Sequence, residues 1–280
     1  MDIDLSTAFQ DWIERDLLEL DRGDVEKVVI KDYSIDERTG RLDQRDVVTL
    51  TKDPGDEWKA DRMRSSQEID KTTMTALLAA VDDLNIVGVR PKPAGLSATL
   101  TRDEGARLSR ADVQSLQSRG YYFTQDGQLV SNEGEVQVET KDGVLYTLRF
   151  GEVVYGAGET VTAGSEPVGG DEDQKGPGAN RYLFITVDFD PRALAEPRKP
   201  SDTAFQGKDE GEWTDADRKN KDLFDAHEEW RTRADEGQKQ AAELNRRFAG
   251  WYYVISSDDF EKMRLTRRDL VKTRSAESDG

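Results

Sequence analysis

The sequence predicts an α+β protein, in which antiparallel β-hairpins form a sheet flanked by helices and a long charged helix lies near the C-terminus. Three features carry this prediction. The stretch "EVQVETKDGVLYTLRFGE" (Glu135 to Glu152) has alternating runs on both sides of Asp-Gly, which is typical of a β-hairpin. The stretch "RYLFITVDFD" reads as the most apolar strand. From Thr214 to Phe248, sparse apolar anchors among charges predict a long helix.

The N-terminal half is expected to alternate helices with short strands. A first helix would run from Ser6 to Leu20, because Thr7 and Gln10 fit a capping box and an apolar stripe follows. Its stripe contains Phe9, Trp12, Ile13, Leu17 and Leu20. Strands are expected over 25–30 and 46–51, joined by a polar connection, with a third over 57–61, a helix over 68–84 and a strand over 85–89.

The C-terminal half continues with more hairpin signals. A helix should begin at Ser109 and end at Gly120, and strands over 121–124 and 128–131 precede the hairpin. Residues 156–179 are rich in Gly, Ser, Glu and Asp and are expected to form a flexible loop. A strand over 251–256 is followed by a last helix that Ser257 caps.

The domain organisation suggested by the sequence is a module over 21–280, with a helical excursion over 201–250, preceded by the helix of residues 1–20. "STAFQDWIERDLLEL" near the start echoes "SSDDFEKMRLTRRDLVK" near the end, with a different spacing from Phe to Asp. If the echo is real, the first helix is the tail of a missing upstream module. Its apolar stripe would then be partly exposed, and we expect weak self-association through it.

Composition excludes several classes of protein. The 280 residues carry a formal net charge of −18, which argues against nucleic acid as the main partner and against anionic lipid. Arg264, Arg267 and Arg268 make only a short basic run, and Arg246 with Arg247 is shorter still. With no cysteine there is no thiol nucleophile or zinc–thiolate site. No apolar run is long enough to span a bilayer, so we expect no direct membrane insertion by this chain.

Candidate reactive residues are few. His227, the single histidine, lies among glutamates on the charged helix and is expected to be solvated. Asp188 and Asp190 with Asp258 and Asp259 could supply the two carboxylates of a glycosidase, but strand-end and helix-cap roles explain all four. We therefore assign no catalytic, cofactor-binding or metal-binding residue.

Two other stretches have both a structural and a functional interpretation. "GGDEDQKGPGAN" offers oxygen ligands for calcium but lacks the order of an EF-hand, which favours a plain loop. "GYYFTQDG" and "WYYVIS" cluster aromatic residues that would suit a carbohydrate or stacking platform, although core packing or an interface is favoured for these ordinary strand residues.

Several long blocks resemble one known family: "FQDWIERDLLELDRGDVEKVVIKDYSID", "DDLNIVGVRPKPAGLS", "SNEGEVQVETKDGVLYTLRFGE", "NRYLFITVDFD" and "WYYVISSDDFEKMRL". The family is bacterial and is known as domain of unknown function number 4340. The resemblance implies an N-terminal membrane anchor and an earlier copy of the module. It also implies gene neighbours that encode ABC transporters of the gliding-motility type. It transfers no catalytic residue.

These observations leave competing functional hypotheses. The first is a non-catalytic binding or structural module, an extracytoplasmic accessory to a membrane transport complex, tethered to the membrane in the intact protein and contacting a protein partner. The alternative is a carboxylate-based hydrolase acting on cell-surface polysaccharide. A third is a cation-binding surface protein. A cytoplasmic location remains the alternative to an extracytoplasmic one.

Overall fold

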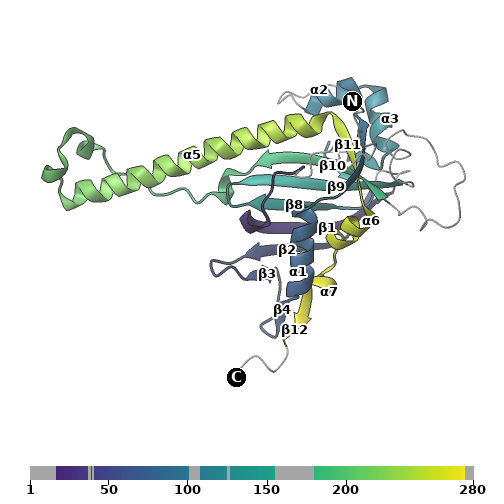
Figure 1. Ribbon diagram of the computed structural model, residues 1–280, viewed down its shortest axis with the longest axis horizontal. Coiled ribbons are helices and arrows are strands. Elements are labelled where there is room, and N and C mark those ends of the chain that lie inside the picture. Colours follow the sequence, from purple (N-terminus) through teal and green to yellow (C-terminus); the bar gives the residue numbers. More distant parts are fainter. Residues whose placement is uncertain are drawn as a thin grey trace, which may run out of the picture.

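The computed structural model describes residues 17–36, 39, 41–100, 108–124, 127–154 and 180–274. Within these residues, eight strands form a sheet in the order β3-β2-β1-β8-β9-β10-β11-β5, and all neighbours in it are antiparallel (Figure 1). The predicted α+β class is therefore confirmed. The strands are β1 (Val25–Asp36), β2 (Arg41–Lys52), β3 (Trp58–Ala60), β5 (Ile86–Pro91), β8 (Glu135–Thr140), β9 (Val144–Val154), β10 (Asn180–Phe189) and β11 (Trp251–Ile255).

Smaller elements surround this sheet. Two short antiparallel pairs lie outside it, β4 (Gln67–Ile69) with β12 (Val271–Thr273) and β6 (Tyr121–Phe123) with β7 (Leu129–Ser131). The helices are α1 (Lys71–Asp82), α2 (Ala94–Leu100), α3 (Arg110–Gln117), α5 (Asp215–Ala249), α6 (Ser257–Met263) and α7 (Arg267–Leu270). Short 3₁₀ turns span Arg22–Asp24, Pro191–Ala193, Ala204–Gly207 and Glu210–Glu212.

The β8–β9 hairpin forms as the sequence predicts. Its pairing runs from Glu135 opposite Arg149 to Glu139 opposite Leu145. The Gly143 N–H donates to the Thr140 carbonyl (2.9 Å), and Gly143 has φ of +79°, a conformation that glycine adopts without steric cost. The Asp-Gly signal therefore fixed the turn, and with it the register of the two central strands.

One face of the sheet is covered by α1 and α6 and forms the main core. Met74, Leu77 and Val81 recur at helical spacing along α1, so they point to the same side and pack on the sheet. From α6, Phe260 and Met263 join the same buried cluster. Each of these large apolar side chains contributes about 1.5–3 kcal/mol when it is fully buried.

The opposite face is covered only in part. Here α2, α3 and β6 pack over β10 and β11, and β7 lies against β9 and β1. The Tyr121 and Tyr252 rings stack with centroids 6.1 Å apart, and Phe184 lies tilted against both. Leu96 of α2 and Leu116 of α3 complete this second buried cluster.

Helix α5 closes an open sheet edge. Strand β11 pairs with β10 only over Arg181–Leu183, which leaves the rest of that edge without a strand. The Asn245 side chain fills this place, because its Oδ1 accepts from the Val187 N–H (2.8 Å) and its amide group donates to the Val187 carbonyl. Leu244 and Phe248 anchor the same part of α5 in the main core.

A buried lysine lies where α5 ends. Lys92 is 6% exposed, and its ammonium donates to the Phe248 carbonyl (3.0 Å) in the last turn of α5. The Phe184 and Tyr252 rings lie 4.0 and 5.5 Å from Nζ. The C-terminal carbonyls of a helix attract a cation, and the aromatic faces do the same. Burial lowers the pKa of Lys92 to about 7.

Several predicted boundaries are wrong, and the reason is tertiary packing. The polar connection expected between residues 30 and 46 is mostly strand, because β1 continues to Asp36 and β2 starts at Arg41. Tyr33 and Ile35 are buried against Tyr122 and Val130 of the β6–β7 pair, which extends the hairpin.

Other corrections concern helix ends. The helix expected over 68–84 starts later, because Asp70 caps it and Gln67–Ile69 pairs with β12 instead. The last predicted helix is capped by Ser256 and not by Ser257. The sequence pattern did not reveal α2, α7 or β12, which are short.

The N-terminal segment also differs from the prediction where the structure describes it. Residues 17–20 are bends and coil and not the end of a helix, and Leu17, Leu18 and Leu20 are buried in the main core. The Tyr146 hydroxyl donates to the Leu18 carbonyl (2.9 Å). The rest of the predicted stripe (Phe9, Trp12 and Ile13) and the predicted loop over 156–179 lie outside the described residues.

Candidate functional site

The most conspicuous feature outside the core is an arm, which we define as residues 194–236. A helix rises about 1.5 Å per residue, so the 35 residues of α5 span roughly 50 Å. Its C-terminal part packs on the sheet, while its N-terminal part projects well beyond it (Figure 1). The 3₁₀ turns Ala204–Gly207 and Glu210–Glu212 lie at the far end. The arm therefore presents surface at a distance from the main core.

The tip of the arm is held by its own small cluster. Phe205 is buried against Trp213 and Phe224, with ring centroids 6.0 and 5.8 Å away. Lys208 Nζ lies 2.8 Å from both carboxylate oxygens of Asp217. This ion pair, followed by hydrogen bonds from Thr214, lowers the pKa of Asp217 to about 2. The tip is thus a built structure and not a frayed helix end.

The middle of the arm is braced against the coil segment that leads outward to the tip and against the sheet. Trp230 Nε1 donates to the Leu194 carbonyl (3.2 Å). Where the arm meets the sheet, the Arg233 guanidinium binds the β8–β9 turn, 3.0 Å from Asp142 Oδ1. Gly237 follows, and a Cβ there would lie 2.6 Å from the Asp142 carbonyl oxygen. The turn and the helix therefore touch backbone to backbone.

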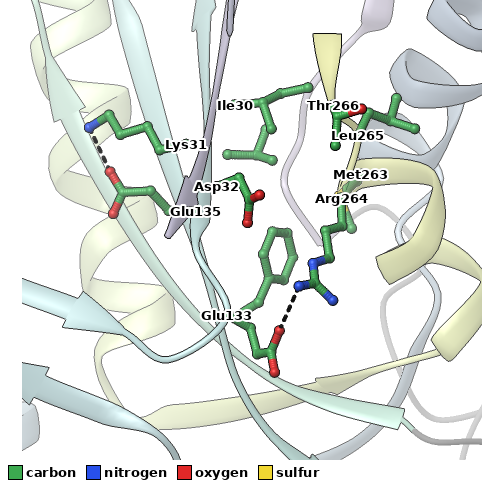
Figure 2. Close-up of a pocket in the computed structure, with 11 residues that line it drawn as sticks. Ile30, Lys31, Asp32, Glu133, Glu135, Met263, Arg264, Leu265 and Thr266 are labelled. Carbon is green, nitrogen blue, oxygen red and sulfur yellow. Dashed lines mark hydrogen bonds and ion pairs between the residues drawn. The ribbon is translucent and has the colours of Figure 1, made fainter. Parts of the chain in front are cut away.

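A cavity of about 300 Å³ lies between β1, β8 and the segment that links α6 to α7. In Figure 2 the Glu133 carboxylate and the Arg264 guanidinium, which both line the cavity, point toward each other and form an ion pair (3.3 Å). Glu133 also pairs with Arg181 (3.3 Å), and the Phe260 ring lies 4.6 Å from that guanidinium. Ile30 forms part of the apolar wall of this cavity. The charges here are paired with each other and hold α6 to the sheet.

Two members of a buried charged cluster, Lys31 and Glu135, also line this cavity, and the cluster is centred on Glu135, which is only 6% exposed. Lys31 Nζ lies 2.7 Å from its Oε1, and Arg149 Nε lies 3.2 Å from its Oε2. The Tyr33 hydroxyl donates to Oε2 (3.1 Å), and Gln137 Nε2 donates to Oε1 (3.3 Å). Burial, followed by the charge of Glu135, raises the pKa of Tyr33 to about 12, so this phenol stays neutral.

The four aspartates considered for catalysis have structural roles or lie exposed. Asp190 caps a 3₁₀ turn and pairs with Arg192 (2.9 Å), which lowers the pKa of Asp190. Asp259 accepts from the Asn85 N–H (3.0 Å) and from the hydroxyl of the cap residue of α6. Asp258 lies in the first turn of that helix, and Asp188 is exposed on β10.

His227 is less solvated than the sequence suggested. Its side chain is 18% exposed, its Nε2 lies 3.4 Å from Glu196, and its ring lies 5.3 Å from that of Trp230. It therefore helps to brace the arm. In the part of the chain that the structure describes, no three or more His, Asp or Glu side chains are grouped so as to hold a metal ion.

The remaining candidate residues that the structure describes mostly have structural roles. Tyr121, Tyr122, Tyr252 and Tyr253 are buried, as the core-packing interpretation expected, whereas Phe123 and Trp251 of the same two stretches are exposed. The short basic run does not form a free patch, because Arg267 pairs with Asp61 (2.6 Å) and Arg264 with Glu133. Most of "GGDEDQKGPGAN" lies outside the described residues.

The fold and these sites define an α+β protein built on an antiparallel sheet that carries a projecting helical arm. Residues 1–99 match a family model described as "Domain of unknown function (DUF4340)", which supports the family resemblance found in the sequence. No curated protein and no solved structure matches the chain. None of the described helices is long and apolar enough to cross a membrane.

The arm's built tip and the Glu135 cluster were not predicted from the sequence. A signal for the cluster was present: Lys27 and Lys31 are four residues apart on one strand, and Glu135 and Glu139 are four apart on another. Antiparallel pairing of these two strands would match each lysine with a glutamate, as the register shows.

Proposed function

We propose that this chain is a non-catalytic interaction module that contacts a protein partner through its arm. We further propose that it acts outside the cytoplasm, tethered to the membrane in the intact protein, as an accessory to a membrane transport complex. The observation that carries the interaction is the arm itself, a helix that leaves the sheet and ends in a tip with its own aromatic cluster. The transport complex is suggested by the family resemblance and its ABC transporter neighbours.

The chemistry of the buried charges also favours binding over catalysis. Glu135 is held between two cations, and Tyr33 keeps its proton at neutral pH. A general acid or base must exchange a proton near the working pH. The Glu135 carboxylate is instead held by its own neighbours in ion pairs with Lys31 and Arg149.

The interaction can be tested by photo-crosslinking in the bacterium that encodes the protein. A photoreactive amino acid would replace Glu229, which is exposed on the arm, and a matched control would replace Arg268, which is exposed on α7. We expect position 229, and not position 268, to crosslink to a membrane transport component identified by mass spectrometry. Equal crosslinking at both positions, or none at position 229, would contradict the proposal.

The location can be tested separately, because the chain has no cysteine of its own. In intact cells, a single Glu229→Cys variant should react with a maleimide that cannot cross the inner membrane. Labelling only after the cells are lysed would show that the arm lies in the cytoplasm.

A further inference from the structure

A second cavity, of about 520 Å³, lies between β7 and strands β1, β2, β8 and β9. It opens on the face of the sheet opposite α1 and α6, because Lys31, Glu135 and Arg149 alternate along their strands with core residues. These three side chains line one part of the cavity, and Leu42, Val47 and Leu129 give it an apolar part. Its volume falls in the range of small-molecule sites, roughly 300–1,000 Å³.

The unused hydrogen-bonding capacity of the charged part belongs to donors. Both oxygens of Glu135 are already approached by two groups each. The Lys31 ammonium has three N–H groups and donates one hydrogen bond to Glu135. Arg149 donates to the Thr186 hydroxyl (2.9 Å), while its Nε is buried and makes no aligned hydrogen bond despite its short distance to Glu135.

The charge in this cavity has the opposite sign to that of the whole chain. Two cations and one carboxylate line it, so it carries a net positive charge in a protein whose formal charge is −18. Arg149 is 15% exposed and Lys31 is 34% exposed, so the positive charge is partly desolvated and yet accessible at Lys31. Such a charge attracts an anion more strongly than a solvated one does.

We propose that this cavity binds a small monocarboxylate with an apolar body, whose carboxylate contacts Lys31 and Arg149 and whose body packs on Leu42, Val47 and Leu129. An acceptor-only anion complements the free donors. The apolar walls supply the contact that a bare inorganic anion cannot use. This site is separate from the arm, so the proposal stands or falls independently of the proposed function.

The probe is hexanoate, titrated into the full chain and followed by amide chemical shifts in ¹H–¹⁵N spectra. We expect saturable shifts in β1, β7 and β8. Hexanamide, which has the same body without the charge, and inorganic phosphate, which has charge without the body, should both bind much more weakly. No saturable shift with hexanoate, or equally tight binding of either comparison compound, would overturn the proposal.

The matched variants are Lys31→Gln and Lys27→Gln. Lys27 makes the same kind of ion pair on the same strand and face, 2.9 Å from Glu139 and 38% exposed, but it does not line the cavity. Lys31→Gln should weaken hexanoate binding by about tenfold or more, because a unit charge is lost at the ligand. Lys27→Gln should leave the affinity unchanged. Equal affinities of the two variants would refute the assignment.

A third variant guards against loss of folding in Lys31→Gln. Gln44 is exposed and lines the cavity, so Gln44→Glu adds a carboxylate without removing an internal contact. It should weaken hexanoate binding several-fold, whereas Gln238→Glu, on the exposed surface of α5, should not. Unchanged binding in Gln44→Glu would count against the site.

Discussion

Lys92 makes the free energy of unfolding depend on pH in a window where few other groups titrate. Its pKa is about 7 in the folded chain and 10.5 when unperturbed. Between these two values the unfolded chain holds the proton that the folded chain has released. Stability must therefore rise as the pH rises from 7 toward 10.5, and below 7 this contribution is constant.

The magnitude follows from the same two values. The slope approaches 1.4 kcal/mol per pH unit, so two units within the window add about 2–3 kcal/mol. The Lys92→Met variant keeps the apolar stem but cannot titrate, so its stability should lack this rise. Tyr33 and Tyr253, whose pKa values are both raised to about 12, lower stability only as the pH passes the unperturbed value of 10.0.

The assay is urea unfolding of both proteins at several pH values from 7 to 9.5, followed by tryptophan fluorescence. The difference between the two stabilities, and not either one alone, isolates Lys92 from groups that the proteins share. We expect the free energy of unfolding of the wild type to rise steadily relative to that of the variant across this pH range. Parallel curves would show that Lys92 stays charged in the folded chain, so that the carbonyl and the rings offset its burial.

Three further predictions concern the arm and its attachment. Gly237→Ala should lower the melting temperature, because overpacking against the β8–β9 turn typically costs about 1–3 kcal/mol. This cost outweighs the gain in helix propensity of roughly 1 kcal/mol. The control Gly250→Ala, with open space around the new methyl group, should not lower the melting temperature. Asn245→Leu should destabilise by about 1–3 kcal/mol in urea, because two backbone groups of β10 lose their partner. Asp217→Asn should speed proteolysis within the arm at neutral pH, because the ion pair with Lys208 is lost. In the wild type, proteolysis within the arm should also become faster as the pH falls from about 4 through about 2, where this carboxylate takes up its proton.

The elements that the sequence predicted well are those with local signals. The β8–β9 hairpin has an alternating first strand and an Asp-Gly turn, and α5 has the capping box of Thr214 with Asp217. Neither depends on a distant part of the chain. The extension of β1 and β2 does, because Tyr33 and Ile35 become buried only when the β6–β7 pair folds over them.

The candidate sites were harder to foresee for the same reason. The Glu135 cluster combines residues from β1, β8 and β9, so it exists only once the register of three strands is fixed. Each residue alone looks like a polar position on a solvated strand face. Lys92 likewise follows a strand and a proline. Nothing nearby in the sequence predicts that its ammonium contacts the last turn of a helix more than 150 residues away.

The attachment of α5 has a mechanical consequence. The helix is fixed to the sheet at Arg233, Asn245 and Phe248, by contacts with a turn, a strand and Lys92 respectively. From Asp215 to Glu236 it extends over roughly 33 Å. A load applied at the tip therefore acts as a torque about these fixed points, and the strain falls on β9 and β10. The arm therefore acts as a cantilever, and a deflection of its tip would transmit force to the strands at the centre of the sheet.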